Sequence, residues 1–123
     1  MIELGVLKDK NKTKQLFEQN NLEFGGFSVC VSAVSAGDEL GYCLLDIGLE
    51  KTVVYCIEPL NDVPLADGIL RSALHVSAER GVMNAFYADT LSEEFLNKIG
   101  FIKNQEEKRL DIDKLFSSCC SCK

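Results

Sequence analysis

Three of the chain's six cysteines lie within its last five residues, at Cys119, Cys120 and Cys122. Thiolates this close together can bind a soft metal ion such as zinc or cuprous copper, or can exchange disulfides. Because three thiolates do not complete the tetrahedral site of a structural zinc ion, a fourth ligand would have to come from elsewhere. The sequence therefore predicts a metal or thiol site in a cysteine-rich tail, residues 117–123. The alternative is a terminus whose cysteines have no such role.

The other three cysteines are spaced thirteen residues apart in apolar stretches, at Cys30, Cys43 and Cys56. If Val34 lies opposite Glu39 and Ile47 opposite Thr52 in antiparallel strands, these thiols become direct cross-strand neighbours in one row. A slip of one residue in either register would move part of the row to the other face of the sheet. Because free cysteine also behaves as a small buried hydrophobe, core packing is the alternative explanation.

Two further side chains could move protons. Glu58 ends an apolar, strand-like stretch, where its carboxylate could deprotonate an amine; the alternative is a solvated strand end. His75 is the only histidine, and it lies between Arg71 and Glu79 at helical spacing. Pairing four residues apart on the polar face of a helix accounts for His75 without a catalytic role.

The elements that hold these residues follow from the apolar pattern. A polar helix is expected over residues 10–20, where Leu16 and Phe17 supply its apolar contacts. Three strands are expected over residues 27–34, 40–47 and 52–58, which are rich in β-branched, aromatic and leucine residues and are separated by turn residues. Two consecutive short hairpins predict an antiparallel meander.

A helix is expected over residues 66–79, where the apolar positions fall three and four apart. Asn61 or Asp62 can cap its start, Pro64 suits its first turn, and Gly81 can end it. A strand over residues 82–88, a short helix over 91–98 and a last strand over 108–112 follow. The buried helical stripe consists of Ala66, Ile69, Leu70, Ala73, Leu74 and Ser77. This order predicts one α/β (α+β) domain spanning residues 1–123, with a mixed, mostly antiparallel sheet flanked by helices.

Composition limits the possible partners and compartment. The 123 residues include 13 basic and 19 acidic side chains, for a net charge of -6. This balance disfavours nucleic acid and anionic membranes, because phosphate binding needs clustered Lys and Arg. No apolar run approaches the roughly 20 residues of a membrane span, and the start does not read as a signal peptide. Because the cysteines do not follow the pattern of small secreted disulfide proteins, we expect a reducing, cytoplasmic environment.

Three segments together resemble the GNAT (N-acetyltransferase) superfamily. They read ELGYCLLDIGLEKTVVYCIEPL, ILRSALHVSAERGV and FLNKIGF, and the resemblance covers residues 39–112. It implies that acetyl-CoA binds between two splayed parallel strands, here 52–58 and 82–88. The pantetheine arm would lie along the first strand, the pyrophosphate at the start of the following helix, and Glu58 would be the base. The implied cofactor-binding residues are Cys56, Ile57, Leu65, Ala66, Asp67, Gly68 and Ile69.

The sequence departs from the family pattern at the positions that bind phosphate. Those positions fall on Asn61, Pro64 and Ala66, of which Ala66 alone fits. Proline has no backbone N–H to donate, and Asp62 and Asp67 bring negative charge to the same helix start. Each acid would instead stabilise the helix as a cap or dipole partner, by about 0.5–1 kcal/mol.

The leaving-group position departs as well. The tyrosine that protonates the leaving thiolate in many members is replaced by Leu96. Tyr87 is the nearest tyrosine, but it lies in an expected strand, where it would pack.

Three functions remain open from the sequence. The first is a GNAT-type acyltransferase that moves an acetyl group from acetyl-CoA to an amine of a small molecule or protein. The second is a non-catalytic GNAT-like binding module, favoured by Pro64, Asp67 and Leu96. The third is a protein that handles metal or thiols through Cys119, Cys120 and Cys122. The sequence indicates no oligomeric state.

Overall fold

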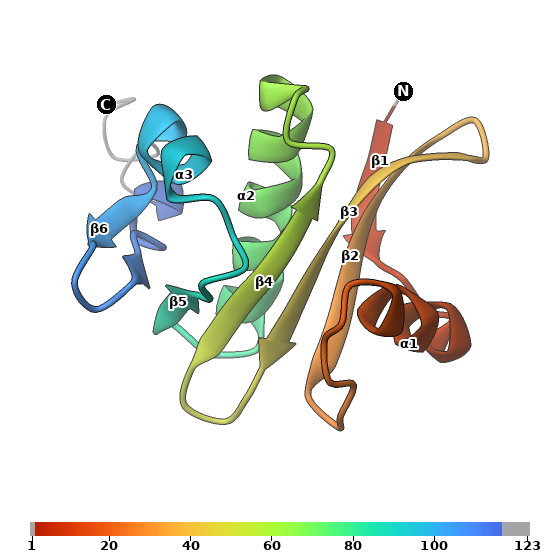
Figure 1. Ribbon diagram of the computed structural model, residues 1–123, viewed down its shortest axis with the longest axis horizontal. Helices are drawn as coiled ribbons and strands as arrows, with labels where there is room; N and C mark the ends of the chain where they lie inside the picture. Colours follow the sequence, from red (N-terminus) through yellow and green to blue (C-terminus); the bar gives the residue numbers. More distant parts are fainter. Residues whose placement is uncertain (1, 117–123) are drawn as a thin grey trace.

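The computed structural model describes residues 2–116, whose strands form a single sheet (Figure 1). The sheet has seven strands in the order β1-β2-β3-β4-β5-β7-β6. β4 and β5 pair in parallel, and every other neighbouring pair is antiparallel. The strands are β1 (Ile2–Val6), β2 (Ser28–Ser35), β3 (Asp38–Ile47), β4 (Thr52–Glu58), β5 (Ala85–Tyr87), β6 (Ile102–Asn104) and β7 (Arg109–Leu110). The helices are α1 (Lys10–Gln19), α2 (Val63–Glu79) and α3 (Glu93–Ile99). The expected mixed, mostly antiparallel sheet flanked by helices is confirmed.

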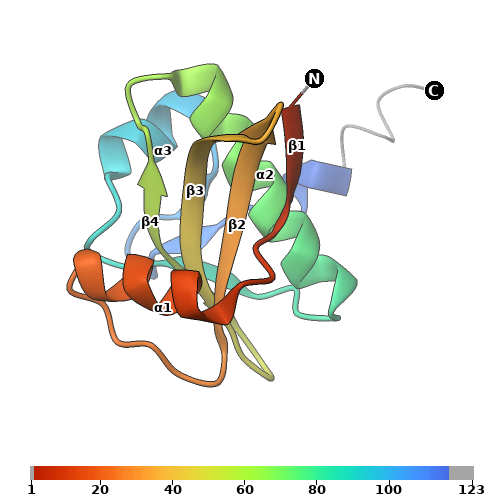
Figure 2. The ribbon, with the colours of Figure 1, turned by 90° about the vertical axis from the view of Figure 1, so that its right-hand side faces the viewer.

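The helices cover both faces of the sheet. α1 lies across one face and α2 runs along the other (Figure 2). The larger core cluster combines residues of the sheet, α2 and α3, whereas the smaller one surrounds Phe17 of α1. None of the helices in residues 2–116 is long and apolar enough to cross a membrane.

α1 begins at the expected residue, and α2 begins at Val63, before the expected 66 but directly after the predicted cap Asp62. The Asp9 carboxylate caps α1 by accepting hydrogen bonds from the amides of Asn11 and Lys12. Asp62 caps α2 by accepting from the amide of Leu65, and Pro64 lies in the first turn. All six residues of the predicted stripe in α2 are buried against the sheet. α2 therefore presents a continuous apolar face to the strands that surround the candidate site.

The shorter strands differ from the sequence prediction. β1 and β6 were not expected, and β5 is shorter than the predicted 82–88. Val82 does not join the sheet because its amide donates to the carbonyl of Ser77 (3.0 Å) and closes the end of α2. Gly81, at φ 82°, supplies the left-handed turn before it. The strand can start only after this cap, and it is therefore only three residues long.

The predicted row of three thiols is wrong. Val34 does pair with Glu39, and Ile47 with Thr52, but each hairpin contains a register shift beyond that pair. Each shift adds one residue to one strand and turns the following side chains to the opposite face.

The cysteines are consequently divided between the two faces. Cys30 of β2 and Cys56 of β4 both lie opposite Leu44 of β3, in the cluster under α1. Cys43 belongs to the cluster under α2, where it pairs with Val31 and Ile57. All three thiols are free.

Candidate functional site

β4 and β5 are joined over only part of the length of β4. Their parallel register contains three pairs, the last of which is Val54 with Tyr87. β4 continues for another four residues, 55–58, which have no partner on β5. The two strands therefore form a fork that opens toward the end of β4 and the start of α2 (Figure 1).

The loop after β5 closes the narrow end of this fork. The amide of Ala88 donates to the carbonyl of Val54 at 2.9 Å. The hydroxyl of Thr90 then donates to the carbonyl of Tyr55 at 2.6 Å. The Tyr55 carbonyl, the first one after the pairing of β4 with β5 ends, is therefore already bonded. A ligand along this edge would have to bind after Tyr55 or displace Thr90.

A bulge in β4 sets which side chains face the fork from the α1 side. Leu44 pairs with Cys56 and Leu45 with Val54, which leaves Tyr55 without an opposite residue. Tyr55 and Cys56 consequently both pack in the cluster under α1. The Tyr55 hydroxyl donates to Asp46 at 2.8 Å. Burial, together with this hydrogen bond to Asp46, raises the pKa of Tyr55 to about 12.

Glu58 is exposed at the end of β4, close to polar side chains on the α1 side of the sheet. Tyr42 lies directly opposite Glu58 in β3. The Cys56 thiol donates to the Asn20 side-chain oxygen at 3.6 Å, and the Asn20 amide donates to the Tyr42 hydroxyl at 3.4 Å. Burial, and secondly the nearby Glu58 carboxylate, raise the pKa of Cys56 to about 11. Burial also raises the pKa of Tyr42, against the opposing effect of the bond from Asn20.

The position of Tyr42 beside Glu58 could not be read from the sequence. Extending the pairing of Ile47 with Thr52 without a bulge would place Ile57 opposite Tyr42. The register shift between Leu44 and Leu45 brings Glu58 there instead. Asn20 was expected only as the last residue of a helix, and its contacts depend on how α1 packs on the sheet.

Gly41 allows the end of β4 to approach β3. A Cβ at this position would clash with the Glu58 carbonyl oxygen and would lie 2.8 Å from Pro59 Cδ and 2.9 Å from Ile69 Cδ1. Only glycine therefore fits between the end of β4 and α2. This contact fixes where Glu58 lies relative to the helix that follows it.

The start of α2 offers little to a diphosphate. Two amides of this turn are already bonded to Asp62. The Leu65 amide donates to its carboxylate, and the Ala66 amide donates to its backbone carbonyl. Pro64 has no amide hydrogen. Of the amides in this turn, these contacts therefore leave only that of Val63 for a ligand. Free amides and a positive helix end are what anions bind, and the carboxylate of Asp62 opposes them. Beyond Tyr55 the edge of β4 has no partner on β5, whereas the start of α2 fits the diphosphate of acetyl-CoA poorly.

The residues predicted to bind the cofactor lie in different environments. Ile57, Ala66 and Ile69 are buried in the core cluster under α2, and Cys56 is on the α1 side. Asp67 forms an ion pair with Arg71 at 3.1 Å, directed along the helix. Leu65 and Gly68 line a cavity of about 660 Å³ between β1 and the start of α2. These residues surround the start of α2 but do not line one common cavity.

A smaller cavity lies between the starts of α2 and α3. It measures about 230 Å³, less than the roughly 300–1,000 Å³ of typical ligand pockets. Its mouth carries both a carboxylate, Glu94, and an ammonium group, Lys98. The lining residues are Leu60, Asn61, Val63, Ser92, Glu94, Phe95 and Lys98.

The other residues considered from the sequence have structural roles. Leu96 is fully buried, and the Tyr87 hydroxyl donates to Glu93 at 2.7 Å. His75 lies 3.9 Å from Glu79 on the exposed face of α2, as its spacing predicted. Cys119, Cys120 and Cys122 lie outside the described residues, and metal binding by them stays a prediction. Within residues 2–116 no group of three or more His, Cys, Asp or Glu side chains could hold a metal ion.

The order of the strands, the forked parallel pair and the helices on both faces define the GNAT fold. The crystal structure of the ribosomal-protein-S18-alanine N-acetyltransferase from Escherichia coli has this fold and matches the chain with a TM-score of 0.58. The match covers 89% of this chain and 88% of that one, at 11% sequence identity. No protein-family model and no curated protein sequence matches the chain. The similarity is therefore one of fold.

Proposed function

We propose that this protein is a GNAT-type acyltransferase that transfers an acetyl group from acetyl-CoA to an amine. The observation that carries the proposal is the end of β4, whose edge toward β5 has no partner and where exposed Glu58 lies opposite Tyr42. A strand edge without a partner can hydrogen-bond an extended amide chain, and the pantetheine arm is such a chain.

Each residue then has a distinct task. Bound acetyl-CoA supplies a thioester carbonyl for the amine to attack. Glu58 accepts the proton that the amine loses, as a general base at the end of β4. Tyr42 and Asn20 orient the acceptor on the α1 side, where their polar atoms meet Cys56. Leucine has no acidic group, so Leu96 of α3 supplies no proton here. As the amine nitrogen bonds to the acetyl carbon, the thioester C–S bond would break, and the CoA thiolate would take its proton from water.

The acceptor is an amine of a small molecule or protein, and the protein acts in the cytosol. Its net charge of -6 opposes nucleic acid and anionic membranes as partners.

Acetyl transfer is tested with acetyl-CoA and a panel of primary amines, including peptide N-termini and polyamines. Product should be detected by mass spectrometry, because the chain's own thiols react with reagents that report free CoA. The substitution Glu58→Gln should lower the rate by about 10²–10⁴-fold with little effect on CoA binding. Glu94→Gln, at the rim of the smaller cavity, is the matched control. Equal rates for wild type and Glu58→Gln, or no product with any amine, would contradict the proposed acyltransferase activity.

A second candidate is a GNAT-fold binding module without catalysis. The bond from Thr90 to the Tyr55 carbonyl and the Asp62 cap favour it, because both occupy groups that a cofactor would use. In this case CoA at millimolar concentration should not raise the melting temperature, whereas a bound ligand must raise it. A rise with CoA together with absent turnover would indicate CoA binding without transfer.

A further inference from the structure

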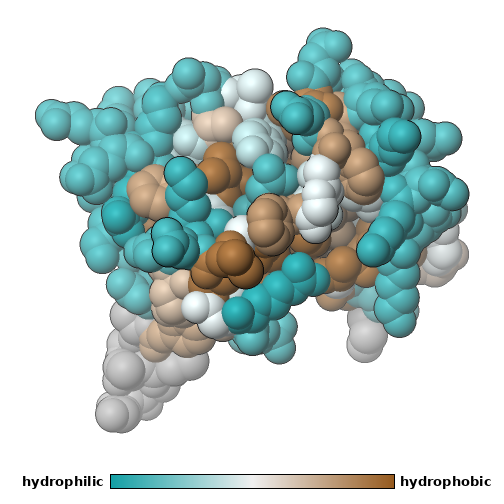
Figure 3. Space-filling model, turned by 90° about the horizontal axis from the view of Figure 1, so that it is seen from below, coloured by the Kyte–Doolittle hydropathy of each residue, from teal (hydrophilic) through white to brown (hydrophobic). Residues whose placement is uncertain are grey.

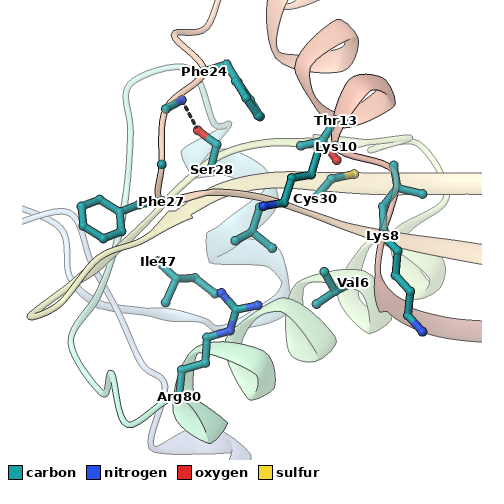
Figure 4. A pocket seen from close by; sticks show the side chains of 14 residues that line it. Val6, Lys8, Lys10, Thr13, Phe24, Phe27, Ser28, Cys30, Ile47 and Arg80 are labelled. Atoms are coloured by element: carbon teal, nitrogen blue, oxygen red, sulfur yellow. Dashed lines mark hydrogen bonds between the residues drawn. The ribbon is translucent and has the colours of Figure 1, made fainter.

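A further cavity lies at the opposite end of the sheet from Glu58. It measures about 550 Å³, within the range of small-molecule sites. It forms because β1 leaves β2 early: the last contact is from the Leu7 amide to the Cys30 carbonyl, at 2.8 Å. Ser28 and Val29 of β2 therefore have no β1 partner. The start of α1, the loop before β2 and the end of α2 wall the space that remains (Figure 4).

The charged side chains that line this cavity are all cationic. They are Lys8, Lys10 and Arg80, in a chain whose net charge is -6. Lys10 and Arg80 extend into the cavity from opposite sides, whereas the ammonium group of Lys8 points away from them (Figure 4). None of the three has a carboxylate within ion-pair distance among residues 2–116. The two unneutralised cations that face this space, Lys10 and Arg80, favour an anion there.

The acids that adjoin lining residues, Asp9, Asp46 and Glu79, have other partners; Glu79 lies 3.9 Å from His75. The Asp9 carboxylate, between Lys8 and Lys10 in sequence, accepts from two amides at the start of α1. The Asp46 carboxylate accepts from the hydroxyls of Ser28, at 3.0 Å, and Tyr55. None of these acids lines the cavity. The positive charge of the cavity is therefore left for a ligand.

The remaining lining is largely apolar. Val29 and Ile47 are buried, Phe24 lies near α1, and the ring of Phe27 points away from Lys10 and Arg80 (Figure 4). Phe27 is 52% exposed, and Leu49 in the neighbouring turn is 87% exposed. Seen from this end of the molecule, hydrophobic side chains gather near the centre of the face, with hydrophilic ones around them (Figure 3). Free phosphate would leave this surface uncovered, whereas an anion with an apolar body would cover it.

We propose that this cavity binds a small organic anion, a carboxylate or phosphate monoester carried on an aryl or short alkyl body. The anionic group lies between Lys10 and Arg80, where a guanidinium can bind two oxygens at once. The apolar body covers Val29, Ile47 and the two phenylalanines. The site is separate from the fork beside Glu58, and the proposal does not depend on acetyl transfer.

The test follows backbone amide signals of the full chain by NMR during titration. The probes are phenyl phosphate, hexanoate, inorganic phosphate and the neutral benzyl alcohol. We expect one of the two organic anions to shift the amides of Lys10, Ser28, Val29 and Arg80, and to bind more tightly than inorganic phosphate. Which of them binds better distinguishes a phosphate from a carboxylate ligand. Equal binding of benzyl alcohol, or no shift with either organic anion, would overturn the proposal.

Charge variants separate this cavity from its surroundings. Lys10→Gln and Arg80→Gln should each weaken binding of the better anion by about tenfold, because each removes a charge-assisted contact. Lys51→Gln removes the same charge at the same end of the molecule, beside a neighbouring cavity, and should leave affinity unchanged. All three side chains belong to exposed residues, and the spectra report directly whether each variant is folded. If Lys51→Gln weakens binding as much as Lys10→Gln, the site assignment is wrong.

Discussion

The hydroxyl of Thr90 donates to the backbone carbonyl of Tyr55, at the point where β4 and β5 separate. Thr90→Val keeps the shape of the side chain and removes this donor. We expect the free energy of unfolding to fall by about 0.5–1 kcal/mol, because Thr90 is exposed and water can replace the bond. CoA should bind several-fold more tightly, since the Tyr55 carbonyl becomes available. Thr90→Ser, which keeps the donor, is the control; the expectation fails if Val and Ser variants behave alike in calorimetry.

Asp62→Asn should improve CoA binding by about 2–5-fold. Asparagine caps a helix as well as aspartate does, so α2 keeps its start while losing the negative charge that faces a diphosphate. The gain should shrink as salt is added, because exposed charges are screened. Asp113→Asn, an exposed acid that pairs with Lys103, controls for net charge. Isothermal titration at two ionic strengths measures both effects, and equal gains in the two variants would contradict a local role for Asp62.

Gly41→Ala should destabilise the protein by about 1–3 kcal/mol. Its Cβ would meet the Glu58 carbonyl and Pro59, and neither can move without shifting the end of β4. Gly5→Ala is the matched substitution, because a Cβ on Gly5 of β1 meets nothing within 4 Å. Gly5→Ala should be near neutral in a denaturant melt. A Gly41→Ala variant as stable as Gly5→Ala would mean that the contact with β4 is not restrictive.

The substitution Ser77→Ala should lower the free energy of unfolding more than Thr52→Val does. The Ser77 hydroxyl donates to the Val82 carbonyl at 2.6 Å, so it accepts from Thr52 across the 2.7 Å contact between them. Both hydroxyls are buried. Ser77→Ala leaves the buried Thr52 hydroxyl without an acceptor and the Val82 carbonyl without this donor, and each loss costs about 1–3 kcal/mol. In Thr52→Val, the Ser77 hydroxyl stays bonded to Val82. A double-mutant cycle in urea measures the coupling, and additive single losses would refute it.

Stability should decrease as pH rises above about 9. The Cys56 thiol has an ordinary pKa of 9.0 and a pKa of about 11 in the folded protein. Because the pKa of Cys56 is higher in the folded protein, the thiol loses its proton first in the unfolded chain. The contribution of Cys56 to the free energy of unfolding is therefore complete below pH 9 and is lost between pH 9 and 11. Cys56→Ala should flatten the pH dependence in this interval. Equal slopes for wild type and variant in urea melts would exclude Cys56 as a cause.

Much of this fold can be predicted from local sequence patterns. The start of α2 was predictable because Asp62 and Pro64 are residues that begin helices, and the six-residue stripe identifies its buried face. β1 carries the alternating apolar pattern of a strand, at Ile2, Leu4 and Val6, although all three side chains are exposed. β6 has no such signal, since it is three residues long.

The candidate site was less predictable because it depends on the register shift between β3 and β4. Nothing in the residues around Leu44 announces the extra residue at Tyr55, which is accommodated by packing against Phe17 of α1 (ring centroids 6.4 Å apart). That single residue decides whether Ile57 or Glu58 lies opposite Tyr42. Likewise, the bond from Thr90 to β4 joins residues 35 apart in sequence, and no local pattern encodes it.

The three-pair junction between β4 and β5 has a mechanical consequence. Few backbone bonds cross that line, so the parts of the sheet on either side can tilt against each other without breaking the remaining ladders. α2 has its main strand contacts with β1, β2, β3 and β4 and would remain with that part of the sheet during such a tilt. The aperture beside Glu58 is then governed by a handful of contacts, and its width can change while the rest of the molecule stays intact.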